Sequence, residues 1–114
     1  MANHSASLDT AFHALADPTR RAVVHRLVRG AAPVKELAAP FEMGLPAFLK
    51  HLRVLEESGL IATEKRGRVR TCRLQPGRLT ETERWLSRQR ALWDASAERL
   101  AAYVETQMEE DETE

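Results

Sequence analysis

The chain has a single cysteine, Cys72, among its 114 residues. A disulfide within the chain is therefore impossible, which fits a reducing compartment and excludes dithiol redox sensing. We expect Cys72 to act as a small apolar residue on a strand, with a reactive thiol as the alternative interpretation.

Long apolar runs are also missing. No segment approaches the roughly 20 residues of a membrane span, and the N-terminus lacks the apolar core of a signal peptide. Glycine-rich phosphate loops, nucleophile motifs and carboxylate pairs typical of enzymes are not recognisable. With 43% hydrophobic and 30% charged residues, the composition predicts one globular domain in the cytoplasm and no enzymatic activity.

The formal net charge is zero, but the charges are unevenly distributed. Six of the 17 acidic residues lie in the last ten positions, so the preceding part carries 17 basic and 11 acidic residues, a charge of +6. Residues 47–78 contain eight basic and three acidic residues. This local excess of positive charge is typical of a surface that binds a polyanion.

The segment from Met43 to Ile61 has the pattern of a short helix with a signal at each end. Gly44 is a permissive N-cap, and Pro46 suits the first turn, where its missing N–H forfeits no intrahelical hydrogen bond. Gly59 suits the left-handed conformation that often follows a helix C-terminus.

The two sides of this predicted helix differ in character. Phe48, Leu52 and Leu55 repeat at i, i+4 and i+7, which predicts one buried face. The other side carries Leu49, Lys50, His51 and Arg53. An apolar back with a cationic front suits insertion into a groove lined by phosphates.

Residues 61–74 predict two short strands around a turn at Arg66-Gly67-Arg68, where Gly67 supplies a positive φ. The tip of this hairpin is rich in cations. A helix followed by a basic hairpin is the layout of a winged helix-turn-helix, in which the helix enters the major groove and the wing contacts the backbone or minor groove.

Three helices are predicted before this unit, at residues 8–16, 17–29 and 34–39, and residues 1–7 are expected to be disordered. Asp17 and Pro18 have the pattern of an N-cap followed by the first helical position. The residues expected to face inward from the second and third helices are Ala22, Val23, Val24, Leu27, Val34, Leu37 and Ala38.

A long final helix is predicted from about Thr80, where Glu83 completes a capping-box pattern, to about Met108. Leu86, Trp93 and Leu100 are spaced by seven, as in helices packed lengthwise. We expect this helix and the first one to form a dimer interface, although the final helix could instead fold back on its own domain. The predicted interface residues are Leu8, Phe12, Leu15, Trp85, Leu86, Leu92, Trp93, Leu100 and Tyr103.

Residues 105–114 are expected to form a disordered acidic tail, or alternatively to compete with DNA for the basic surface.

Several stretches together closely resemble the ArsR/SmtB family of bacterial regulators: Asp-Pro-Thr-Arg-Arg at 17–21, Glu-Leu-Ala at 36–38, Leu-Pro-Ala at 45–47, Lys-His-Leu-Arg-Val-Leu-Glu at 50–56, Gly-Leu at 59–60 and Lys-Arg-Gly-Arg-Val-Arg at 65–70. The resemblance covers about residues 8–104. It implies a mostly α-helical winged helix-turn-helix protein, with four helices, a two-stranded β-hairpin wing and a last helix. It also implies a homodimer, held by the first and last helices, that represses transcription from an inverted-repeat operator.

The residues expected to contact DNA are Arg20, Arg21, Pro46, Ala47, Leu49, Lys50, His51, Arg53, Lys65, Arg66, Arg68 and Arg70. Members of this subtype usually have serine at the positions of Gly44 and Leu49. Leu49 cannot donate a hydrogen bond to DNA, although it could contact a thymine methyl group. This departure leaves open an alternative function, a protein-interaction module on the same dimeric scaffold with weakened operator recognition.

Many relatives sense metals, but the ligands are not in place here. No cysteine lies near Glu36 and no histidine follows His51, and the four histidines show no convergent spacing. We therefore expect no metal and no cofactor. An organic effector at a Trp85/Trp93 interface remains a further hypothesis.

Overall fold

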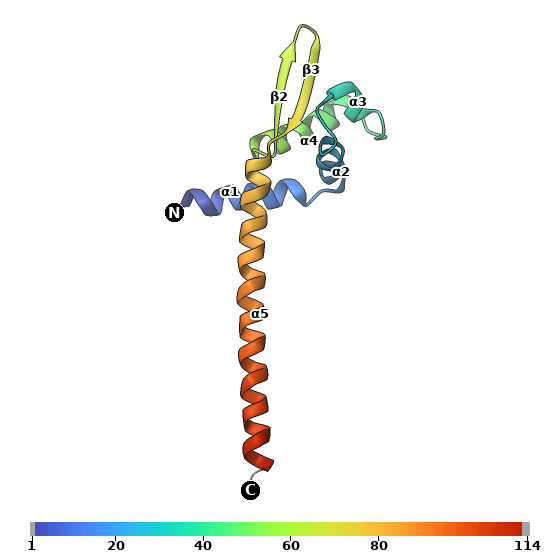
Figure 1. The fold of residues 1–114 in the computed structure, drawn as a ribbon. Helices are drawn as coiled ribbons and strands as arrows, with labels where there is room; N and C mark the ends of the chain where they lie inside the picture. Colours follow the sequence, from blue (N-terminus) through green and yellow to red (C-terminus); the bar gives the residue numbers. More distant parts are fainter. Residues whose placement is uncertain (1, 113–114) are drawn as a thin grey trace. The chain divides into compact units, whose positions relative to one another are not determined.

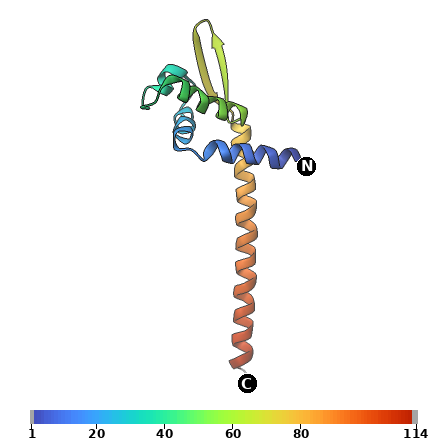
Figure 2. The same ribbon diagram turned by 180° about the vertical axis from the view of Figure 1, so that it is seen from behind.

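The computed structural model describes residues 2–112 and contains five helices and three short strands in that range (Figures 1 and 2). In chain order they are α1 (Ala2–Leu15), α2 (Pro18–Leu27), β1 (Ala32–Pro33), α3 (Val34–Ala38), α4 (Leu45–Glu57), β2 (Ile61–Arg66), β3 (Val69–Leu74) and α5 (Pro76–Glu112). Residues 1–82 and 83–114 form two compact units, called unit 1 and unit 2, which are described separately. The predicted winged helix-turn-helix order is confirmed, with one added strand.

The added strand β1 makes the sheet three-stranded, in the order β1-β3-β2. Ala32 pairs with Cys72 and Pro33 with Thr71, so β3 is the central strand. The sequence analysis missed β1 because two residues cannot display the alternation that identifies a strand. Pro33 is tolerated here because β1 lies at the sheet edge.

The core of unit 1 is built around the apolar face of α4. Phe48, Leu52 and Leu55 are all buried, as their spacing predicted. Phe41 packs beside Phe48, with ring centroids 5.5 Å apart. The other core residues come from α1, α2, β1, α3, the α4–β2 loop and the sheet: Ala14, Val23, Val24, Leu27, Ala32, Leu37, Leu60, Ile61 and Cys72.

Helix α1 packs against the rest of unit 1 through small residues. Ala11 and Ala14 are fully buried, whereas Phe12 is 37% exposed. Helix α1 contacts both α2 and α4, and small side chains let helices approach each other more closely than large ones do. The expectation that Ala22 faces inward is wrong, because Ala22 is exposed on α2.

The C-terminus of α4 ends in a Schellman turn. The Leu60 N–H donates to the Leu55 carbonyl oxygen (3.1 Å) and the Gly59 N–H donates to that of Glu56 (3.0 Å). Gly59 has a φ of +81°, which disfavours any residue with a β-carbon. A β-carbon there would also lie 3.1 Å from Nε of Arg78, which donates to the Ser58 carbonyl oxygen.

Helix α5 begins at Pro76, earlier than predicted. The capping-box assignment of Thr80 is wrong, because Thr80 lies inside the helix and its hydroxyl donates to the Pro76 carbonyl oxygen (3.0 Å). The helical bounds also include residues 2–7 and 105–112, for which the sequence suggested disorder; residues 1, 113 and 114 lie outside the described range. None of the described helices is long and apolar enough to cross a membrane.

We predict that Gly59→Ala lowers the free energy of unfolding by more than the roughly 1–2 kcal/mol of left-handed strain, because the new methyl group also meets Arg78. Gly67→Ala is the matched control for strain alone, since Gly67 has a φ of +62° and open space around it. Urea unfolding of both variants measures the difference. If both variants lose the same free energy of unfolding, the contact between the new methyl group and Arg78 adds no destabilisation.

Candidate nucleic-acid interface

The solvent-facing side of α4 is cationic at its centre. Lys50 and Arg53 are exposed one turn apart, and Pro46 and Ala47 are exposed in the first turn. Burial of the opposite face fixes the rotation of the helix, so these side chains must face solvent. The surface can therefore enter a groove and place positive charge beside phosphates or base edges.

The hairpin of β2 and β3, called the wing, projects beyond helices α2–α4 within unit 1 (Figures 1 and 2). Arg66 pairs with Val69, leaving Gly67 and Arg68 as a two-residue turn. A positive φ at the first of these two residues matches a type II′ turn. Lys65, Arg68 and Arg70 are exposed along the wing.

Two contacts anchor or neutralise parts of the wing. The Thr63 hydroxyl donates to Oε1 of Glu56 on α4 (3.0 Å), which ties the base of the wing to that helix. Nε of Arg66 lies 3.3 Å from Oε1 of Glu64, so its charge is partly compensated, although the Arg66 side chain remains 85% exposed.

Two predicted DNA contacts, Arg20 and His51, turn toward the protein instead of solvent. The Arg20 Nε donates to the Ala14 carbonyl oxygen (2.8 Å), and its Nη1 lies 3.0 Å from Nδ1 of His51. Because a guanidinium has no acceptor, Nδ1 of His51 accepts in this contact, and a neutral ring then carries its proton on Nε2. These contacts therefore hold α1 and α2 against α4, whereas the predicted contacts of Arg20 and His51 with DNA remain predictions.

Asp17 completes this group as the N-cap of α2. Its carboxylate accepts a hydrogen bond from the Arg20 N–H (3.1 Å), and His51 Nδ1 lies 3.8 Å away. The hydrogen bond from the Arg20 backbone N–H is the main cause of the lowered pKa of Asp17, and the nearby charge of the Arg20 guanidinium adds to it. Arg21 is exposed, but its Nη1 donates to the Leu15 carbonyl oxygen (2.9 Å) and so caps α1.

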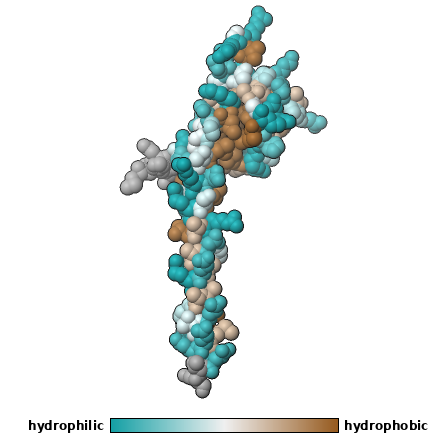
Figure 3. Space-filling model, viewed as in Figure 1, coloured by the Kyte–Doolittle hydropathy of each residue, from teal (hydrophilic) through white to brown (hydrophobic). Residues whose placement is uncertain are grey.

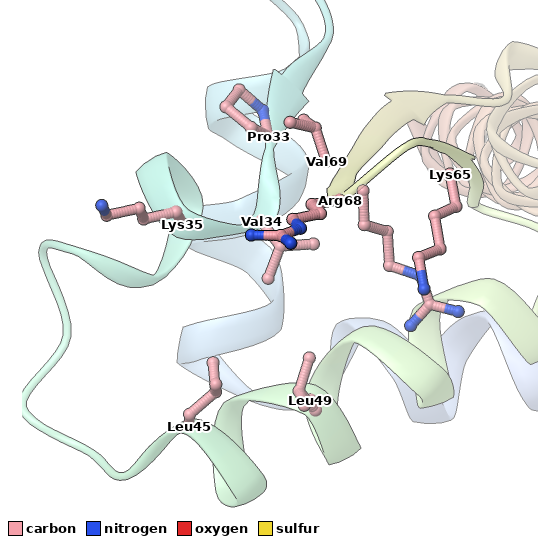
Figure 4. A pocket seen from close by; sticks show the side chains of 9 residues that line it. Pro33, Val34, Lys35, Leu45, Leu49, Lys65, Arg68 and Val69 are labelled. Carbon is pink, nitrogen blue, oxygen red and sulfur yellow. The ribbon is translucent and has the colours of Figure 1, made fainter.

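Leu49 is half-buried and faces a hollow between α4 and the wing, not the open side of α4. This hollow, called the wing cleft, has a volume of about 670 Å³. Figure 4 shows Leu45 and Leu49 rising from α4 on one side and Val34, Arg68 and Val69 on the other. The lining residues are Pro33, Val34, Lys35, Leu45, Leu49, Lys65, Arg68, Val69 and Arg70.

The wing cleft was not predicted from the sequence. Val34 was assigned to the core and Lys35 received no role, because the closeness of α3 to the wing depends on the missed strand β1. One signal was available: Leu45 and Leu49 are apolar residues four positions apart, outside the stripe formed by Phe48, Leu52 and Leu55.

Neither the cysteine nor the other possible metal ligands form a reactive or metal-binding site within residues 2–112. Cys72 is buried in the central strand, and burial raises the pKa of its thiol, so it behaves as the expected small apolar residue. Within residues 2–112, no three His, Cys, Asp or Glu side chains gather closely enough to hold a metal ion.

In unit 2, α5 carries a stripe of exposed apolar side chains. At about 100° per residue they fall on less than half of the helix circumference. The members of this α5 stripe are Leu86, Leu92, Trp93, Leu100, Tyr103, Val104 and Met108, all at least 46% exposed. Of the other predicted interface residues, Trp85 and Leu8 are half-buried, and Leu15 packs against the core of unit 1.

Comparison with known proteins identifies the same architecture. A helix-turn-helix domain family model matches residues 15–64. The crystal structure of an ArsR family transcriptional regulator superposes with a TM-score of 0.76 at 54% identity, covering 79% of this chain and 93% of that one.

Two characterised regulators also match in sequence. The HTH-type transcriptional regulator Rv2034 of Mycobacterium tuberculosis is 43% identical over 70 residues, which is 61% of this chain and 65% of that protein, slightly under two thirds of its length. The transcriptional repressor SdpR of Bacillus subtilis is 25% identical over 79 residues, covering 69% of this chain and 88% of that protein.

Proposed function

Because this chain belongs to the ArsR family of winged helix-turn-helix transcriptional regulators, we propose that it represses transcription as a homodimer on an inverted-repeat operator. The family consists of DNA-binding regulators and not of enzymes. In this proposal, DNA is therefore the polyanion that binds to the basic surface. The similarity to SdpR, a transcriptional repressor, supports repression and not activation of transcription.

The observation that carries this proposal is the set of exposed cations on α4 and the wing. Lys50 and Arg53 enter the major groove from the solvent side of α4, with Pro46 and Ala47 close to the backbone. The wing residues Lys65, Arg66, Arg68 and Arg70 hold phosphates or the minor groove. Arg20 and His51 act indirectly, by fixing α4 against α1 and α2.

The α5 stripe supports the homodimer. Exposed apolar surface of this extent needs a partner in water, and the seven-residue spacing of Leu86, Trp93 and Leu100 suits a second copy of the same helix. A two-fold dimer presents two equivalent copies of α4, so its operator is an inverted repeat. Phe12 and Leu8 on α1 join this interface, whereas Leu15 serves its own core.

The proposed repressor acts without a metal effector, in the cytoplasm and on the nucleoid. The single cysteine and the lack of convergent spacing among the four histidines support this, since structural and sensing sites for zinc or thiophilic ions use those ligands. In this proposal the chain consists of a DNA-binding and dimerisation domain at about residues 8–104, flanked by residues 1–7 and by an acidic segment at 105–114.

Two single substitutions test the DNA contacts. We predict that Lys50→Gln reduces the preference for operator over scrambled DNA by about 1–3 kcal/mol, because a base contact is lost. Arg68→Gln should weaken binding to both DNAs equally and reduce the salt slope by about 0.9, because one phosphate contact is lost. Fluorescence anisotropy at several salt concentrations measures both quantities.

The matched control is Arg88→Gln, which removes an exposed cation from α5 instead of unit 1. It should leave both affinity and salt slope unchanged. If all three variants behave alike, net charge and not the α4–wing surface controls binding, and the proposed contacts are wrong.

The interface is tested by Leu100→Glu in the α5 stripe. The new carboxylate would have to be buried against the partner helix without a counter-charge, so we predict dissociation into monomers and loss of operator binding. Ala102→Glu adds the same charge to the same helix outside the stripe and should remain dimeric. Sedimentation velocity measures the oligomeric state, and a dimeric Leu100→Glu variant would refute this interface.

A further inference from the structure

We propose that the wing cleft binds an amphipathic organic anion, specifically a fatty acid, and that the fatty acid and DNA exclude one another. The binding site itself is independent of the proposed function. Only the regulatory consequence, relief of repression by the fatty acid, rests on it.

The apolar part of the cleft is larger than a folded surface normally leaves open. Leu45 and Val69 are 55% and 54% exposed, although both line a hollow of about 670 Å³. A second hollow of about 530 Å³ continues from Leu45 over Ala38 and Ala39. Pockets for small ligands typically measure about 300–1,000 Å³, so the space suits a hydrocarbon chain.

The space-filling view agrees with this description. It shows apolar surface exposed on unit 1 and bordered by projecting hydrophilic side chains (Figure 3). A hydrocarbon chain in contact with Leu45, Leu49 and Val69 would remove that surface from water, which is the main favourable term for an apolar ligand.

The charged part of the cleft has one sign only. Lys35, Lys65, Arg68 and Arg70 line it, and none of the acidic residues in the described part of the chain does. Lys65 and Arg70 are directly opposite each other in the β2–β3 register, an arrangement that is unfavourable for like charges. A carboxylate placed between them would relieve that repulsion and gain charge-assisted hydrogen bonds.

The two features together favour a fatty acid over an anion without a chain. A free phosphate or a sugar–phosphate backbone would satisfy the cations but leave Leu45 and Val69 in water. A long-chain carboxylate satisfies both parts at once. Because Arg68 and Lys65 are also the proposed phosphate contacts of the wing, the fatty acid and the operator would compete for them.

The direct test is isothermal titration calorimetry of the full chain, without DNA, using dodecanoate below its micelle-forming concentration. We expect saturable binding of one dodecanoate per protomer, weaker binding of hexanoate and no binding of the cationic dodecyltrimethylammonium. Absence of saturable dodecanoate binding would overturn the proposal, whatever the protein does with DNA.

The location is tested by the double variant Leu45→Ser/Val69→Thr, which keeps the fold because both side chains are more than half exposed. It should lose at least tenfold in dodecanoate affinity, while circular dichroism stays that of the unchanged chain. The matched control is Val28→Ser, which removes an exposed apolar side chain at the C-terminal end of α2, outside the cleft and outside the α5 stripe, and should bind normally. Equal affinity in the double variant and the unchanged chain would place the ligand elsewhere and refute the site.

Competition separates this proposal from the proposed function. Dodecanoate should raise the apparent Kd for operator DNA linearly with its free concentration, doubling it when half of the clefts are occupied in the absence of DNA. If the protein binds dodecanoate and DNA simultaneously, exclusion is refuted although the site stands. If the protein binds no operator, the proposed function fails while the calorimetric result still decides the site. If the double variant loses DNA affinity and the unchanged chain binds no dodecanoate, the apolar surface contacts DNA and the proposal is wrong.

Discussion

Burial of Phe48, Leu52 and Leu55 against the core is the constraint on which the arrangement of unit 1 depends. Those three side chains fix the rotation of α4, so Lys50 and Arg53 face solvent on the other side. The Schellman turn at Gly59 then sends the chain directly into β2, whose first residue, Ile61, is buried in the same core. The cationic surface of α4 and the wing are therefore held by one packed cluster, which allows both to meet one DNA duplex without rearrangement.

Much of this arrangement could be predicted from periodicity and helix-end signals. The i, i+4, i+7 repeat in α4, the Asp17-Pro18 start of α2 and the Gly67 turn are local features, and the structure has all three. Non-local features could not be predicted in this way. The two-residue strand β1 is defined only by its pairing with β3, and the inward turn of His51 depends on Arg20, 31 positions away in the sequence. The burial of Ala11 and Ala14 on α1 likewise depends on packing against two other helices. The DNA contacts and the interface residues remain predictions from the resemblance and the exposed charges.

The surface proposed to bind DNA combines two chemically different parts. One part consists of cations with open access to solvent, which suits the uniform charge of a phosphate backbone. The other is the apolar wing cleft, which lies beside those cations and contains Leu49, the residue that departs from the usual serine of the subtype. The absence of a polar side chain at position 49 and the presence of an apolar hollow at the same place both fit a ligand-binding role for this part of the surface. In this account Leu49 belongs to the proposed fatty-acid site and makes no polar contact with DNA.

The central claim is that a dimer of this chain recognises a specific operator through α4 and the wing. The most direct test is a footprint of the purified protein on the promoter DNA upstream of its own coding sequence, with scrambled competitor, at low and moderate salt. The account predicts symmetric protection of an inverted repeat that persists at moderate salt. Protection that is diffuse, indifferent to sequence and lost at moderate salt would contradict it, because counterion release alone would then explain the binding.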